Sequence, residues 1–73
     1  MPIINLKMAT GRTIEQKREL AAALTRETSR VLGLDPERIT VVIEEFPREN
    51  WATGGQTHLE RYGPVPAPPE RKL

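Results

Sequence analysis

Pro2 is the residue best suited to acid–base chemistry, because it directly follows Met1. An initiator methionine is normally removed when the next residue is small, and its removal would leave Pro2 with a secondary amine. An α-amino group has a pKa of about 7.7–8.0, and burial or a neighbouring positive charge lowers it by disfavouring the protonated form. Such a base suits proton abstraction beside a carbonyl. A proline is also tolerated at the first position of a strand, so position 2 taken alone favours a structural role over catalysis.

Composition narrows the kinds of site and partner that the chain could have. The 73 residues include no cysteine, and the single histidine, His58, has no evident partner ligands, so we expect neither a disulfide nor a metal site. The net charge of +1 argues against a dedicated nucleic-acid binder. No apolar run approaches the roughly 20 residues of a membrane span. The first residues lack the regions of a signal peptide, so we expect a cytoplasmic protein.

The elements that would position this proline follow from hydrophobic spacing. Residues 2–8 (PIINLKM) put alternate apolar residues on one face, which predicts a strand. Thr13 and Gln16 have the pattern of a capping box, and apolar residues at helical spacing follow, which predicts a helix over 13–32. Gly33 stands where a left-handed C-terminal cap belongs.

The second half predicts another strand and a small terminal element. Residues 35–37 (DPE) predict a short capped turn. Residues 39–46 (ITVVIEEF) begin apolar on both faces, as in a strand that is covered on two sides. Residues 48–62 predict a turn and then a small hairpin. Four of the eleven residues from 63 onward are proline, so we divide the chain into a domain at 1–62 and an extended or disordered Pro-rich tail at 63–73.

The order strand, helix, strand predicts an α/β (α+β) fold class with one βαβ unit of parallel strands. One helix cannot cover both faces of that sheet, and a short chain is marginal alone, so we expect self-association. Arg12 follows the far end of the first strand, roughly 20 Å or more from Pro2, and could more easily serve the Pro2 of a neighbour. Parallel strands begin at one edge, so Arg38 and Thr40 should lie near Pro2.

Three features occur together in a defined order. Pro2 follows Met1, residues 11–17 read GRTIEQK before the helix, and residues 50–55 read NWATGG after the second strand. With this order and spacing, over residues 2–61, the chain resembles the 4-oxalocrotonate tautomerase family. The resemblance implies a β-α-β fold with a C-terminal hairpin, assembled as a hexamer that uses no cofactor.

The resemblance also implies an activity. In the family, the amino-terminal proline moves a proton between the positions of an enol–ketone pair. Arginines hold the carboxylates of the substrate and polarise its carbonyl, and an aromatic residue makes the pocket apolar. Pro2, Arg12 and Trp51 occupy the matching positions. The implied enzyme is an isomerase of a small unsaturated 2-oxo or 2-hydroxy acid, with Pro2 and Arg12 as catalytic residues.

One position departs from the family pattern. The second catalytic arginine of the best-known members falls at Thr40, while Arg38 lies two residues earlier and would point to the same face. We expect Arg38 and Thr40 to bind the carbonyl end of the substrate. Without an arginine at 40, bidentate carboxylate recognition or carbonyl polarisation is lost. Either the substrate differs from the dicarboxylate dienol of the family, or a different subunit supplies the arginine, as in heterohexameric branches.

Three alternatives remain open at the level of sequence. The chain could be a non-catalytic or complementary subunit of a heterohexameric tautomerase. It also resembles the haloacrylate dehalogenase branch, although that branch needs an arginine and a glutamate where Ala9 and Thr53 stand, with Glu49 close to the second position. Finally, it could be a plain interaction module that uses the Pro-rich tail as its binding arm.

Overall fold

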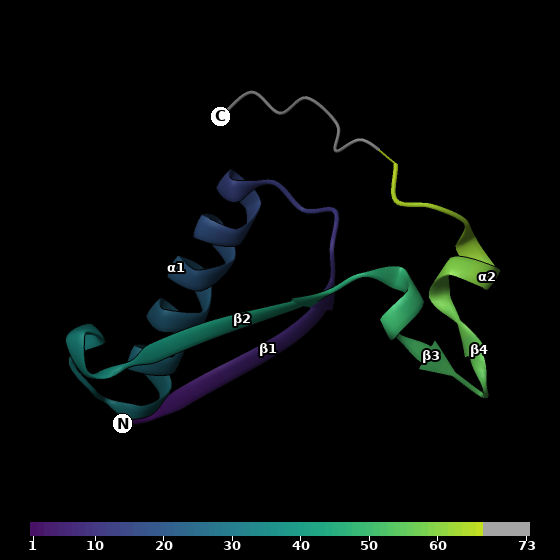
Figure 1. Ribbon diagram of the computed structural model, residues 1–73. Coiled ribbons are helices and arrows are strands. Elements are labelled where there is room, and N and C mark those ends of the chain that lie inside the picture. The colour runs from purple at the N-terminus through teal and green to yellow at the C-terminus, as the bar shows by residue number, and fades with distance from the viewer. Residues whose placement is uncertain (67–73) are drawn as a thin grey trace.

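The two long strands of the molecule lie side by side. In a computed structural model, which describes residues 1–66, β1 (Ile3–Ala9) and β2 (Thr40–Phe46) form a parallel two-stranded sheet. The register runs from Ile3 beside Thr40 to Ala9 beside Phe46. Figure 1 shows β1 and β2 side by side. The predicted βαβ unit is confirmed, and each strand begins one residue later than expected.

The helix α1 (Ile14–Leu32) connects the two strands and packs on one face of the sheet (Figure 1). The Thr13 hydroxyl accepts the Gln16 amide at 3.0 Å, and the Gln16 side-chain oxygen accepts the Thr13 amide at 3.0 Å. The predicted capping box therefore starts the helix. Gly33 ends it with φ of 66°, a left-handed conformation that favours glycine, and its amide donates to the Ser29 carbonyl.

A single turn of 3-10 helix, η1 (Pro36–Arg38), leads from α1 into β2. The Asp35 carboxylate accepts the Glu37 amide at 3.0 Å, and Pro36 occupies the first turn, where its missing N–H is not needed. The predicted capped turn at 35–37 is confirmed.

The chain after β2 forms a small unit of its own. A 3-10 turn, η2 (Arg48–Asn50), precedes an antiparallel hairpin of β3 (Ala52–Thr53) and β4 (Gln56–Thr57). The predicted hairpin is confirmed. The prediction for 48–62 omitted a second helix, α2 (His58–Tyr62), which starts immediately after β4. Its start is another capping box, in which the Glu60 amide donates to the Thr57 hydroxyl at 3.1 Å.

The sheet has one covered face and one open face. Leu6 and Ile43 lie side by side on the face toward α1 and are half-buried. Ile3 and Val42 lie on the opposite face, where 56% and 40% of their surfaces are exposed. Among residues 1–66 no hydrophobic side chain is fully buried. The open face therefore keeps apolar surface of the kind that mediates association.

Two sequence expectations, on membrane spans and on the Pro-rich tail, can be compared with the structure only over residues 1–66. Within residues 1–66, no helix is both long enough and apolar enough to cross a membrane. The predicted Pro-rich tail begins at residue 63, and its residues 67–73 lie outside the described part of the chain. The division of the chain at residue 62 stays a prediction.

Candidate active site

Pro2 lies at the edge of the sheet where both strands begin. It is half-buried, and its carbonyl accepts the Thr40 amide at 3.1 Å. Thr40 is the register partner of Ile3, so its exposed side chain lies on the open face. The amino group of Met1 donates to the Arg38 carbonyl at 3.0 Å. The structure thus brings Pro2, Arg38 and Thr40 together at one edge, as expected for parallel strands.

Arg38 lies near this edge, but its backbone is part of a 3-10 turn and not of a strand. It is the last residue of η1, and its amide donates to the Asp35 carbonyl at 2.9 Å. β2 begins only at Thr40, so the alternation of a strand, which would put Arg38 on the face of Thr40, does not extend to position 38. Strand alternation therefore gives no support for a face shared by Arg38 and Thr40, and that shared face stays a prediction. The expected proximity of Arg38 to Pro2 holds.

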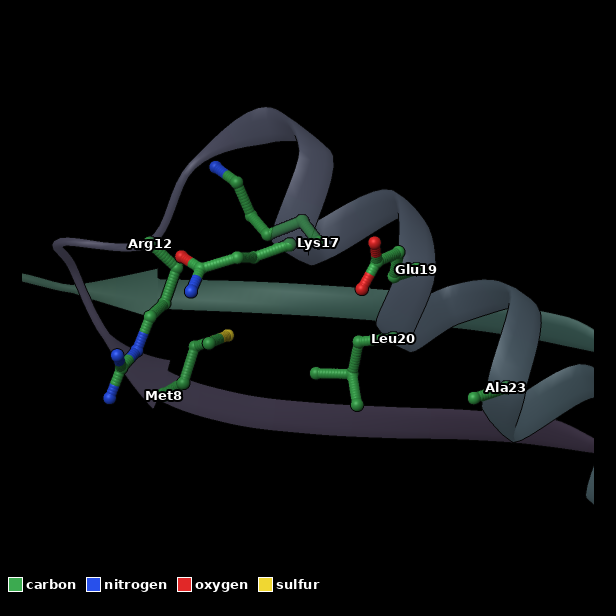
Figure 2. A pocket seen from close by; sticks show the side chains of 7 residues that line it. Met8, Arg12, Lys17, Glu19, Leu20 and Ala23 are labelled. Carbon is green, nitrogen blue, oxygen red and sulfur yellow. The ribbon is translucent and has the colours of Figure 1, made fainter. Parts of the chain in front are cut away.

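Arg12 lies at the opposite end of the sheet. It is exposed, and it follows Gly11 in the loop between β1 and α1. β1 has seven residues, which span about 20 Å, so Arg12 and the Pro2 of the same chain are about that far apart. Figure 2 shows the Arg12 guanidinium extending past Met8 at one end of a hollow between α1 and the sheet.

This hollow, of about 380 Å³, combines an apolar floor with polar groups at its rim. Its lining residues are Met8, Arg12, Gln16, Lys17, Glu19, Leu20 and Ala23. The Lys17 ammonium is held 2.7 Å from the Glu45 carboxylate. Arg12 forms no hydrogen bond or ion pair with the rest of residues 1–66. The guanidinium of Arg12 is therefore the cation at this rim that a carboxylate ligand can engage without breaking an existing contact.

Trp51 stands in a row of four rings at the same end of the sheet. Its ring centroid lies 6.1 Å from that of Phe46 and 5.7 Å from that of His58, which in turn lies 5.3 Å from Tyr62. The Phe46–Trp51 and His58–Tyr62 pairs meet edge to face, a favoured geometry for aromatic rings. This packing restrains the ring of Trp51, and we call its apolar surface the wall.

Lys7 is a cation near this wall that the sequence reasoning left out. A shallow hollow beside Trp51 is lined by Lys7, Phe46, Asn50, Trp51 and Ala52. In the register Lys7 pairs with Glu44, two residues before Phe46, so Lys7 and Phe46 share the open face. Lys7 and Phe46 are far apart in sequence, so their shared face can be recognised only when the register of β1 and β2 is known.

Within one chain the predicted site residues form two groups. Pro2, Arg38 and Thr40 lie at the starting edge of the sheet, and Arg12 and Trp51 lie at the other end. Each end has part of what acid–base chemistry on a carboxylate needs: a proline at one, a guanidinium and an apolar wall at the other. A site that combines Pro2 with Arg12 therefore requires two chains.

Two carboxyl groups with shifted pKa values belong to helices and to neither group of predicted site residues. The Thr57 amide, and to a lesser degree its hydroxyl, hold the pKa of Glu60 below its ordinary value by hydrogen bonding to the carboxylate. The Arg30 guanidinium lowers the pKa of Glu27 in the same way. Both shifts concern the stability of helices and not the chemistry at Pro2.

The chain is similar to known proteins of one family in both sequence and structure. Residues 2–59 match the family model described as tautomerase enzyme. The 2-hydroxymuconate tautomerase of Bacillus subtilis is 39% identical over 56 residues, which cover 77% of this chain and 90% of that protein. A 4-oxalocrotonate tautomerase isozyme from Methylibium petroleiphilum superposes with a TM-score of 0.80 at 38% identity, over 82% of this chain and 94% of that one.

Two further solved structures show the range of related proteins. A heterohexameric 4-oxalocrotonate tautomerase from Chloroflexus aurantiacus superposes with a TM-score of 0.79 at 32% identity, over 82% of this chain and 97% of that one. A structure analysed for trans-3-chloroacrylic acid dehalogenase activity gives 0.68 at 44% identity, over 71% and 98%. The family match over residues 2–59, together with the βαβ fold and these neighbours, shows that the chain belongs to the tautomerase family, among the 4-oxalocrotonate tautomerases.

Proposed function

We propose that the protein is an isomerase that catalyses keto–enol tautomerisation of a small unsaturated 2-oxo or 2-hydroxy acid. The observation that carries this proposal is the place of Pro2, half-buried at the edge where β1 begins and beside Thr40 and Arg38. While Met1 is present, the Pro2 nitrogen is an amide and is not basic. Removal of Met1 would convert it into a secondary amine at that edge.

The proposed reaction uses one base in two roles. The Pro2 amine takes the proton from the enol hydroxyl of the substrate, and the protonated amine then delivers a proton to a carbon of the conjugated chain. The enol oxygen becomes a carbonyl, and no electrons are gained or lost, so the step needs no cofactor. Arg12 would bind a carboxylate of the substrate, and Trp51 would cover its apolar part.

The proposed site is completed by a neighbouring chain. Arg12 lies at the end of the sheet opposite Pro2, and the open sheet face exposes Ile3 and Val42. Related proteins assemble, as the heterohexamer from Chloroflexus aurantiacus shows for itself. We therefore propose a hexamer of this chain in which the Pro2 of one subunit meets the Arg12 of another.

Thr40 bears on the choice of substrate. β2 begins with a neutral hydroxyl, and Arg38, an arginine at this edge, belongs to η1. A hydroxyl offers one donor, whereas a guanidinium offers several in a plane that matches a carboxylate. We therefore propose that Arg38 and Thr40 together bind the carbonyl end, and that a substrate with one carboxylate is handled better than a dicarboxylate.

The strongest second candidate is a complementary subunit of a heterohexameric tautomerase. The threonine at position 40 favours it, because a different subunit could supply the missing arginine, as does the similarity to a heterohexameric relative. The native mass of the active complex distinguishes the two candidates. An active hexamer that contains a single kind of chain rules out the complementary subunit.

Haloacrylate hydration is a weaker candidate. The similarity to a structure analysed for dehalogenase activity supports it. However, the positions that would need an arginine and a glutamate are Ala9, at the end of β1, and Thr53, in β3. We therefore place it behind tautomerisation.

The proposal is tested with Pro2→Ala, after intact mass has shown that Met1 is removed in both variant and wild type. We expect kcat/KM for phenylenolpyruvate and 2-hydroxymuconate to fall by about 100-fold or more, the range of a lost general base. Pro69→Ala, which lies outside both residues 63–66 and the residues that match the family model, is the matched control and should behave as wild type. Full activity in the processed Pro2→Ala protein would show that Pro2 is not the base.

A further inference from the structure

The residues after α2 lie against the loop that carries Arg12. We call residues 63–66 the arm. A Cβ atom on Gly11 would lie 2.8 Å from Val65 Cγ1, closer than such carbons approach in proteins. Figure 1 shows the arm turning back from α2 toward the loop between β1 and α1. Val65 therefore occupies the space directly beside Gly11, the residue before Arg12.

One side chain holds the arm in this place. The Arg48 guanidinium donates through Nη1 to the Gly63 carbonyl at 2.7 Å, and it lies 3.3 Å and 3.4 Å from the Tyr62 and Pro64 carbonyl oxygens. These carbonyls lie at the end of α2 and just after it, where backbone acceptors lack helical partners. Arg48 is half-buried, so its charge-assisted bonds are less exposed to competing water than those of a surface arginine.

The loop between β1 and α1 contains one flexible position, Gly11, that contact with the arm can restrain. The Thr10 amide bonds to the Phe46 carbonyl at 2.9 Å, and Thr13 caps α1, so the two ends of the loop are fixed. Between them, Gly11 has φ of 126°, which side-chain-bearing residues rarely adopt, and glycine is the most flexible link in a backbone. The packing of Val65 on Gly11 restricts that link, and Arg12 leaves the backbone one residue later.

We propose that Arg48 is a positioning residue: it clamps the arm over Gly11 and so sets the direction of Arg12 for carboxylate binding. The role of Arg12 in this statement rests on the proposed function. The arm lies beyond residues 2–59, which match the family model. Arg48 and Val65 act through the loop and do not touch the substrate.

The first test is hydrogen exchange, in the full-length protein, of the Thr10 and Thr13 backbone amides, which are hydrogen-bonded at the two ends of the loop. Arg48→Ala and Val65→Gly should both speed this exchange by about threefold to tenfold, as expected for the loss of one or two local contacts. Arg61→Ala is the matched control, since Arg61 bonds to Gln56 and the Thr53 carbonyl in the hairpin and not to the arm. It should leave the loop unchanged.

Unchanged loop exchange in folded Arg48→Ala protein overturns the proposal. If that variant does not fold, Val65→Gly decides, because it keeps the Arg48 side chain and removes the side chain that contacts Gly11. The exchange measurement does not depend on activity. If the processed wild type has no tautomerase activity, the proposed function fails while the positioning of the loop is still decided.

The second test separates positioning from a general structural effect. Arg48→Ala should raise KM for phenylenolpyruvate by about threefold to tenfold and change kcat by less than about twofold, because substrate binding is weakened before the chemical step. In an Arg12→Ala background the same change should have no further effect. Arg48→Lys should restore part of the loss. An effect on KM that persists undiminished without Arg12, or an equal loss in kcat, counts against the proposal.

Discussion

At the scale of single residues, the edge around Pro2 is distinguished by Thr40, the neutral residue with which β2 begins. Thr40 gives a hydrogen bond through its backbone to Pro2, and its side chain lies exposed on the open face of the sheet. A hydroxyl has no charge with which to hold a second carboxylate or to polarise a carbonyl strongly. The residue at position 40 is therefore expected to decide which acids are good substrates.

Thr40→Arg should shift the substrate preference from acids with one carboxylate toward acids with two. The new guanidinium would bind a second carboxylate, and a hydrogen bond to a charged group is worth about 1.5–3 kcal/mol, so kcat/KM for 2-hydroxymuconate should rise by about 10-fold or more. Phenylenolpyruvate, with one carboxylate, is the control substrate and should change much less. Steady-state kinetics on both substrates measure the ratio, and an equal change in the two would show that position 40 does not read the second carboxylate.

At the scale of elements, the short pieces of this fold depend on their caps. α2 has five residues, too few for a helix to persist by its own backbone bonds. Its start is held by the Thr57–Glu60 capping box, and its end is held by Arg48 through the carbonyls of Tyr62 and Gly63. Polar contacts from specific side chains therefore add to the ring packing in stabilising the unit that carries Trp51.

The cap of α2 should make this unit sensitive to acid. The pKa of Glu60 is lowered in the folded state from its ordinary value of 4.5. Its stabilising contribution is therefore complete above that ordinary pKa and is lost as the pH falls through the lower, folded value. Glu60→Gln should be less stable than wild type near neutral pH, and the difference should vanish in acid. Thermal unfolding followed by Trp51 fluorescence measures it, and a difference that stays constant across this range would contradict the assignment.

The same comparison of elements shows what a sequence of this kind can predict. β1, β2 and α1 follow from alternation, from the Thr13 capping box and from Gly33, because these signals are local. α2 has too few residues for a periodic pattern, although its T-x-x-E capping box was present in the sequence. The contacts of Arg48 with the arm and of Val65 with Gly11 join residues distant in sequence, and no local pattern reports them.

At the scale of the whole molecule, the chain is an incomplete unit. None of the hydrophobic side chains in residues 1–66 is fully buried, and Ile3 and Val42 leave the second sheet face apolar and open. The two groups of predicted site residues stand at opposite ends of one sheet, about 20 Å apart by the length of β1. Association of several chains would account for both facts, because it buries apolar surface and can bring the starting edge of one sheet to the far end of another.

Subunit mixing tests this arrangement directly. Pro2→Ala and Arg12→Ala proteins, each processed at Met1, should be weakly active alone. After they are unfolded together and refolded as a mixture of equal parts, about a quarter of the shared sites should hold an intact Pro2 from one chain and an intact Arg12 from another, so activity should approach a quarter of wild type. Variants refolded separately and then combined provide the control without exchange. If native mass shows mixed assemblies but activity stays at the level of the single variants, Pro2 and Arg12 do not share a site between chains.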